Sequence, residues 1–116
     1  MQEAELHQQM LTLMQEVEAE MRRQGLWASY PPSPEAMASR MPFMYDTLKS
    51  YEWLQWVFIP RTRALIDARG QLPGNCNIHP LAEHHLAGRS DIDGSRLLEL
   101  ILQIDKTMSR NSGGVA

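Results

Sequence analysis

The chain has 116 residues, of which 43% are hydrophobic and 22% charged, and its formal net charge is −3. This length and composition predict one globular domain that can bury a core, and the acidic balance disfavours direct binding of nucleic acid. Cys76 is the only cysteine, so no intrachain disulfide can form, which suits a reducing compartment. The acidic start lacks the basic and apolar regions of a signal peptide, and no apolar run approaches the length of a membrane span, so we expect a cytoplasmic protein.

The first predicted element is a helix over about residues 4–24. Its apolar residues recur at steps of three and four, which places them on one face. They are Leu6, Met10, Leu13, Val17 and Met21. Gly25 suits the left-handed position just past a helix end, and Leu26 would then pack back onto Met21 in a Schellman motif.

A short helix is predicted near residues 34–40, because Ser33 suits the N-cap and Pro34 the first turn. The central helix is expected at about 48–69. It is apolar around much of its circumference, which is typical of a buried helix. Pro60 lies inside it and cannot donate a backbone hydrogen bond, so we expect a kink there.

Another short helix is predicted near 80–87, with Pro80 in its first turn, and a third long helix over about 92–110. The apolar stripe of the long helix consists of Leu97, Leu98, Ile101, Ile104 and Met108. Residues 111–116 are predicted to be a flexible tail. No β-strand alternation is evident, so the sequence predicts an all-α fold, a small irregular helical bundle with residues 1–110 as its single domain.

Several motifs between residues 42 and 80 form a pattern that is specific enough to compare with known families. They are Pro42-Phe43, Asp46-Thr47, Glu52-Trp53-Leu54-Gln55-Trp56, Ile59-Pro60-Arg61, Leu72-Pro73-Gly74 and Pro80. Together they resemble the YqcC-like family of small bacterial proteins. The resemblance implies a cytosolic, all-helical protein with no established activity and no known catalytic residue set. Some relatives are encoded beside a tRNA pseudouridine synthase, and this neighbourhood suggests a connection with tRNA modification.

The tryptophan-rich centre is the main candidate site. Trp53 and Trp56 could wall a pocket for a flat or anionic ligand, with Arg61 as a polar anchor. The alternative, which we favour, is that both tryptophans belong to the core. Gln55 lies among apolar neighbours, so its amide needs hydrogen-bond partners if it is buried.

Two weaker constellations could carry chemistry. Asp46 and Glu52 could form an acid/base pair, but capping of a turn and of the central helix is the favoured interpretation. Cys76, His79 and His84 or His85 have some ligand spacing for zinc, and Cys76 could pair with a histidine as a nucleophile. We favour surface histidines and a half-buried thiol, and expect neither a metal nor a cofactor.

The basic residues pose a separate question. Arg22, Arg23, Arg40, Lys49, Arg61, Arg63 and Arg69 could gather on one face and grip RNA, although scattered solvated charges are the default.

The leading functional hypothesis is a non-enzymatic interaction or accessory module, monomeric or homodimeric, that binds a protein partner and has a link to tRNA modification by pseudouridylation. Its working surface would be the groove around Trp56, Arg61 and the loop from Leu72 to Pro80, including Pro73. The competing hypothesis is a small-ligand-binding protein or enzyme that uses a pocket around Trp53, Trp56 and Arg61. The sequence favours neither membrane nor direct nucleic-acid binding.

Overall fold

The computed structural model describes residues 3–74 and 76–113, the last four by their backbone only. Its helices are α1 (Glu3–Arg23), α2 (Pro34–Met37), α3 (Ser50–Trp53), α4 (Ile59–Asp67), α5 (His79–Ala87) and α6 (Ser95–Gly113). A 3₁₀ turn, η1, covers Pro42–Met44, and a π-helical turn, η2, covers Leu54–Phe58 and joins α3 to α4. The described residues contain no strand, so the all-α prediction is confirmed.

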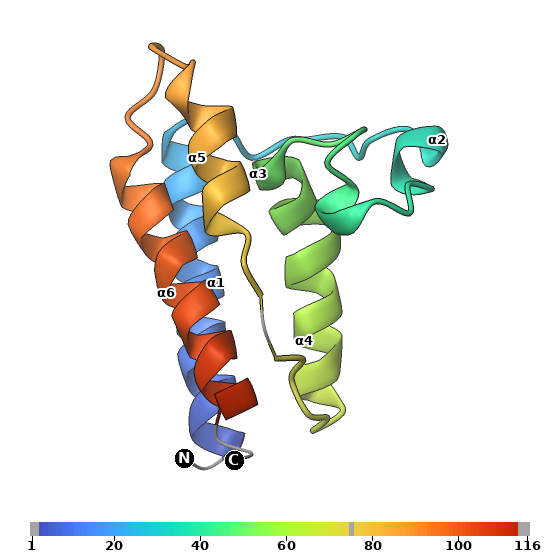
Figure 1. Cartoon of the computed structure of the whole chain (residues 1–116), viewed down its shortest axis with the longest axis vertical. Coiled ribbons are helices and arrows are strands. Elements are labelled where there is room, and N and C mark those ends of the chain that lie inside the picture. The colour runs from blue at the N-terminus through green and yellow to red at the C-terminus, as the bar shows by residue number, and fades with distance from the viewer. Residues whose placement is uncertain (1–2, 75, 114–116) are drawn as a thin grey trace.

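The long helices α1 and α6 run antiparallel and form the most extensive contact in the molecule (Figure 1). Helix α5 packs on α6 and also touches α3. The continuous rod of α3, η2 and α4 stands on the other side of the core, and α2 projects outward from it (Figure 1). The principal axes measure 40, 30 and 24 Å.

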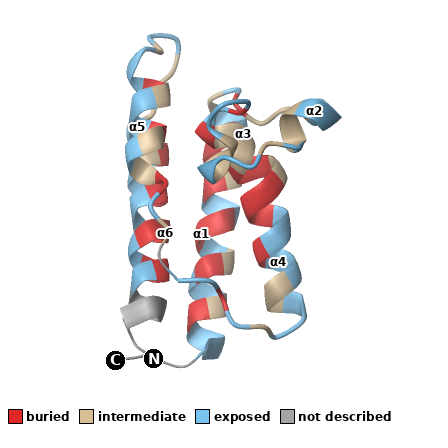
Figure 2. Cartoon of the chain, turned by 45° about the vertical axis from the view of Figure 1, so that its right-hand side comes forward, coloured by how far each residue is buried: buried red, intermediate tan, exposed pale blue. Residues whose placement is uncertain are grey.

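The core is built from the apolar stripes that the sequence predicts, and the buried residues line the inward faces of α1, α6 and the central rod (Figure 2). Helix α1 contributes Met10, Met14 and Met21, which are fully buried. Flexible, polarizable methionine side chains suit the irregular space between helices that are not parallel. Leu98, predicted in the α6 stripe, is only half-buried and packs at the edge of the core.

The predicted stop of the first helix is present as a Schellman motif. Gly25 has a φ of +74°, the amide of Leu26 donates to the carbonyl of Met21 at 2.8 Å, and the amide of Gly25 donates to Arg22 at 3.2 Å. A second motif of the same kind ends α4, where the amide of Gly70 donates to Leu65 at 2.7 Å. Here Arg69 rather than Gly70 takes the left-handed conformation, with a φ of +55°.

These two helix ends give a matched pair of substitutions. A Cβ added at Gly25 would meet no atom within 4 Å, so its cost comes from the backbone alone. We expect Gly25→Ala to lower the free energy of unfolding by about 1 kcal/mol and Arg69→Gly to raise it by a similar or smaller amount. Urea denaturation of both variants measures this. Changes of the same sign in the two variants would contradict the assignment of strain.

The interruption predicted at Pro60 takes the form of the π turn just before it. Pro60 has no amide hydrogen to donate, and the amide of Ile59 reaches back five residues to the carbonyl of Leu54. The wider turn brings Trp53 and Phe58 onto one side, with ring centroids 5.5 Å apart. On a regular α-helix, residues five apart lie about 140° apart around the axis.

Several helix ends differ from their predicted positions. The central rod covers Ser50–Asp67 rather than 48–69, and α2 ends at Met37 after one turn rather than near 40. The Ser33 hydroxyl accepts from the amide of Ala36 at 3.1 Å, as its predicted N-cap role requires.

The last helix begins at Ser95, three residues after its predicted start. The carboxylate of Asp93 accepts from the amide of Ser95 at 3.1 Å, whereas Asp91 pairs with Arg89 at 2.6 Å. The helix continues to Gly113, past its predicted end at 110, so the part of the predicted tail at 111–113 is helical. The remainder of that tail, residues 114–116, lies outside the described residues.

His85 joins α5 to the first turn of α3. Its Nδ1 accepts a hydrogen bond from the amide of Ser50 at 2.8 Å, so this nitrogen must be unprotonated. Burial lowers the pKa of His85 below its ordinary value of 6.5, with smaller contributions in the same direction from the charges of Lys49 and His84, while Glu52 acts against them.

The stabilisation from His85 is therefore present above pH 6.5 and is lost as the pH falls through the lowered pKa. We expect the free energy of unfolding to decrease on acidification more steeply in the native protein than in His85→Gln. His84→Gln, which removes only one of the smaller contributions to the lowered pKa, should change the pH dependence much less than His85→Gln does. Identical pH profiles for the native protein and His85→Gln would contradict this role.

Candidate functional site

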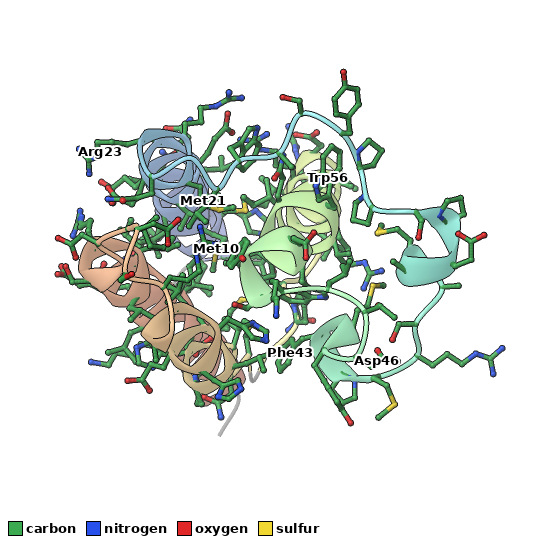
Figure 3. The ribbon with its side chains drawn as sticks, turned by 90° about the horizontal axis from the view of Figure 1, so that it is seen from above. Met10, Met21, Arg23, Phe43, Asp46 and Trp56 are labelled. Carbon is green, nitrogen blue, oxygen red and sulfur yellow. The ribbon has the colours of Figure 1, made fainter. Side chains whose placement is uncertain are left out.

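The structure divides the predicted aromatic site between two hollows on opposite sides of the central rod. Trp53 and Arg61 line a hollow of about 180 Å³, here called the Trp53 pocket. Trp56 lines another of about 490 Å³, here called the Trp56 pocket. Trp56 lies on one side of the rod and Phe43, a wall of the Trp53 pocket, on the other (Figure 3). The described residues therefore do not form the single pocket predicted around Trp53, Trp56 and Arg61.

The π turn explains this separation. On a regular α-helix, Trp53 and Trp56 would lie about 60° apart around the axis and could face one hollow. The wider turn over Leu54–Phe58 rotates the later residues relative to the earlier ones. Trp53 consequently faces Phe43 and Phe58, and Trp56 faces the other side.

The Trp53 pocket is small and mainly apolar, and three of the residues that line it are aromatic. The rings of Phe43 and Trp53 meet edge to face, with centroids 5.0 Å apart and an angle of 83° between their planes. Pro73 and Cys76 complete its wall from the loop after α4. Arg61 is exposed and makes no ion pair with any residue in the described part of the chain. A hollow of this size holds a ligand about as large as benzene.

The thiol of Cys76 is held in its protonated form. Burial is the main cause that raises its pKa to about 12, and the negative charge and hydrogen bond of Asp105 act in the same direction. Only the thiolate is a good nucleophile or metal ligand, so this environment opposes both roles.

The three weak candidates for metal ligation are engaged separately. Cys76 lies beside Asp105, His79 lies 3.5 Å from Glu83, and the ring of His84 lies 5.9 Å from that of His85. Within residues 3–74 and 76–113, no group of three or more His, Cys, Asp or Glu side chains is placed to hold a metal ion.

The predicted acid/base pair is not brought together. Asp46 is exposed and accepts from the Ser39 hydroxyl at 2.5 Å, whereas Glu52 accepts from the amide of Lys49 at 2.8 Å. Both carboxylates thus stabilise turns or helix starts. Pro80 lies in the first turn of α5 and lines neither of the two pockets.

Gln55 is 5% exposed, and both the oxygen and the nitrogen of its amide are hydrogen-bonded. Its oxygen accepts from the amide of Ala28, and its nitrogen donates to the carbonyl of the same residue, both at 2.8 Å. This pair of bonds fixes the segment after α1 against the central rod. Gln55 therefore shapes the Trp56 pocket by positioning its wall.

The Trp56 pocket combines indole rings with two arginines. The guanidinium of Arg22 lies 5.1 Å above the ring of Trp27, and its Nε donates to Glu18 at 2.9 Å. Arg63 approaches the other oxygen of Glu18 at 3.7 Å. The indole nitrogen of Trp56 is buried and has no hydrogen-bond partner among the described residues.

This arrangement can hold an anionic group beside a flat or apolar one, because guanidinium groups bind oxyanions and indoles provide apolar walls. The sequence indicated only part of it. Trp27 lies between the helices predicted at 4–24 and 34–40, and Arg22 and Arg63 belong to the wider set of basic residues that could gather on one face. Of the predicted site residues, Gln55 and Trp56 lie at this pocket.

Comparisons with known proteins identify the family. A family profile described as "DUF446: tRNA pseudouridine synthase C" matches residues 9–107. An "Uncharacterized protein" of Haemophilus influenzae is 33% identical over 98 residues, which is 84% of this chain and 91% of that protein. The "Uncharacterized protein YqcC" of Escherichia coli is 38% identical over 81 residues, which is 70% of this chain and 74% of that protein.

The chain belongs to the YqcC-like family. The solution NMR structure of YqcC from E. coli superposes with a TM-score of 0.74 at 31% identity, over 91% of this chain and 90% of that one. The resemblance inferred from the central motifs is therefore confirmed, and so is the all-helical fold that it implied.

One further relative of this YqcC-like chain carries the name of an enzyme. A tRNA pseudouridine synthase C from Pectobacterium carotovorum is 47% identical over 58 residues, which is 50% of this chain but 15% of that protein. The similarity thus covers a small part of the synthase. In the described part of the chain, none of the helices has the length and apolar character that crossing a bilayer requires.

Proposed function

We propose that this YqcC-like chain is a non-enzymatic accessory module that binds a protein of the tRNA-pseudouridylating machinery. The observation that carries the proposal is the 58-residue match, at 47% identity, within a longer protein named tRNA pseudouridine synthase C. In that protein the matching segment and the rest of the synthase are parts of one chain. When the segment occurs on a separate chain, it is a candidate to bind the synthase.

The surface supports a role in protein binding. Tyr30 is 84% exposed, and Tyr45 and Met41 are 49% and 41% exposed, on the connections that flank α2. Aromatic and methionine side chains are enriched at protein interfaces. We treat residues 1–110 as a single module that acts as a monomer or homodimer in the cytoplasm.

A second candidate function is the binding of a small apolar molecule in the Trp53 pocket. The supporting observation is its apolar lining, which includes Phe43, Trp53 and Pro73. Its volume of about 180 Å³ limits such a ligand to a few heavy atoms.

The accessory role is tested with purified proteins and with cells. The chain is titrated into the tRNA pseudouridine synthase C of its own host by calorimetry, with another pseudouridine synthase of that host as the control. We expect a stoichiometric complex with the first and none with the second, and a reduced pseudouridine content of bulk tRNA when the chain is deleted. No complex together with unchanged pseudouridine would refute the proposal.

A further inference from the structure

We propose that the Trp56 pocket is the docking site for an acidic peptide segment of a partner protein. One carboxylate of the segment would bind between Arg22 and Arg63, and a neighbouring apolar or aromatic side chain would lie against Trp27 and Trp56. The inference rests on the proposed function only in taking the partner to be a protein.

The charge at the Trp56 pocket suits a carboxylate ligand. Glu18 accepts from the Nε of Arg22 at 2.9 Å and lies 3.7 Å from Arg63, so one carboxylate holds two guanidinium groups near each other. The cluster of these three residues keeps a formal charge of +1. The terminal nitrogens of Arg22 donate to no described residue, and they can therefore bind a second carboxylate through two parallel hydrogen bonds.

The indole rings of Trp27 and Trp56 suit an apolar side chain next to that carboxylate. Trp27 lies beside Ala28, whose amide and carbonyl are both fixed by Gln55, so this wall of the pocket is held in place before any ligand arrives. The buried indole nitrogen of Trp56 is a donor without a partner in the described part of the chain. The rings of Trp27 and Trp56 both line the pocket, so they offer apolar surface to a side chain that neighbours the bound carboxylate.

The limited number of cations favours a peptide over RNA. A strand of RNA carries one phosphate per nucleotide, and its binding sites usually provide a row of basic residues. The Trp56 pocket has two arginines with Glu18 between them, and the whole chain is acidic, with a net charge of −3. A single carboxylate with an adjacent apolar side chain matches this balance.

The Trp56 pocket and its surroundings are also large enough to bind a peptide segment. The pocket measures about 490 Å³, which lies within the usual range for anchoring sites. Ser29 forms part of its wall, and the next residue, Tyr30, is 84% exposed. The exposed tyrosine extends the contact surface beyond the pocket, so a segment of several residues could be bound.

The test uses a displayed library of short random peptides and the full chain. We expect the selected peptides to contain Asp or Glu close to an aromatic or aliphatic residue, and their binding to weaken with added salt. The affinity of a synthetic selected peptide is then measured by calorimetry. The Arg22→Gln/Arg63→Gln double variant should weaken it by about tenfold or more.

Matched controls come from neighbouring arginines. Arg23 follows Arg22 but pairs with Glu20 and points away from Trp56 (Figure 3), and Arg61 lies on α4 but lines the Trp53 pocket. Arg23→Gln and Arg61→Gln should change the affinity by less than about twofold. A peptide with Asn in place of Asp should bind the native chain weakly and lose little further affinity in the double variant. Circular dichroism confirms that each variant is folded.

Three outcomes would overturn the peptide site: no enrichment, enrichment of peptides without acidic residues, or equal affinity in the double variant. A single-stranded RNA oligomer that displaces the peptide and requires both arginines would assign the pocket to RNA and overturn it as well. If the synthase binds the native chain and the double variant equally, the site fails while the accessory role stands. If acidic peptides bind and the synthase does not, the accessory role fails while the site stands.

Discussion

Replacement of Asp105 by alanine should lower the free energy of unfolding by about 3 kcal/mol, because a buried carboxylate that holds several donors would be lost. Asp105 is 6% exposed and lies on α6. Its two oxygens accept from the amides of Ile78 and His79, at 3.1 and 2.9 Å, at the start of α5. Without them, two amides at the start of α5 lose their partner. Urea denaturation measures the change, and a loss below about 1 kcal/mol would contradict this role.

The Asp105→Asn variant separates charge from shape. It keeps one acceptor oxygen, so we expect a smaller loss of stability than in Asp105→Ala. It also removes the negative charge that helps to raise the pKa of Cys76 from 9.0 to about 12. The pKa should therefore fall but stay above its ordinary value, because burial is the larger cause. The rate of thiol alkylation as a function of pH measures this shift.

Replacement of Gln55 by leucine should lower the free energy of unfolding by about 2 to 3 kcal/mol. The amide and carbonyl of Ala28 would both lose their partner against the central rod, where water has poor access. Gln55→Glu keeps the acceptor but places an oxygen against the carbonyl of Ala28, so it should also destabilise. Gln71→Leu, at an exposed position, is the matched control and should have almost no effect. Equal stability of Gln55→Leu and Gln71→Leu would contradict the assigned role.

Features determined by neighbouring residues could be predicted from the sequence. The Ser33 N-cap and the Gly25 helix stop each depend on residues within one turn, and the structure confirms both. The apolar stripes of the long helices were also predictable, because a period near 3.6 residues is a local property of the sequence.

Features that depend on distant residues could not be predicted. Gln55 is hydrogen-bonded to Ala28, and Asp105 to Ile78, and in both pairs the residues are 27 positions apart in the sequence. An aspartate within a helical stripe carries no local sign that it will cap another helix. The left-handed conformation of Arg69 could not be predicted either, because the glycine that follows it, Gly70, is the better candidate for that conformation on steric grounds.

The candidate site was predicted in part. Two of its predicted residues, Gln55 and Trp56, border the Trp56 pocket, and three border the Trp53 pocket, namely Trp53, Arg61 and Pro73. If residues 50–67 are drawn as a regular α-helix, Trp53 and Trp56, one from each group, fall close together around the axis, because such a drawing lacks the wider turn before Pro60. The π turn is a response to that proline and to packing, and only three-dimensional contacts reveal it.

The antiparallel pairing of α1 and α6 brings the first turn of α1 and the last turn of α6 to the same end of the molecule (Figure 1). Arg22 lies in the last turn of α1, which a helix of 21 residues places roughly 30 Å from that end. A support or fluorescent label attached through either end would therefore leave Arg22 and its neighbours uncovered. A longer polypeptide could also carry this unit as an insertion, since the chain would enter and leave at one place.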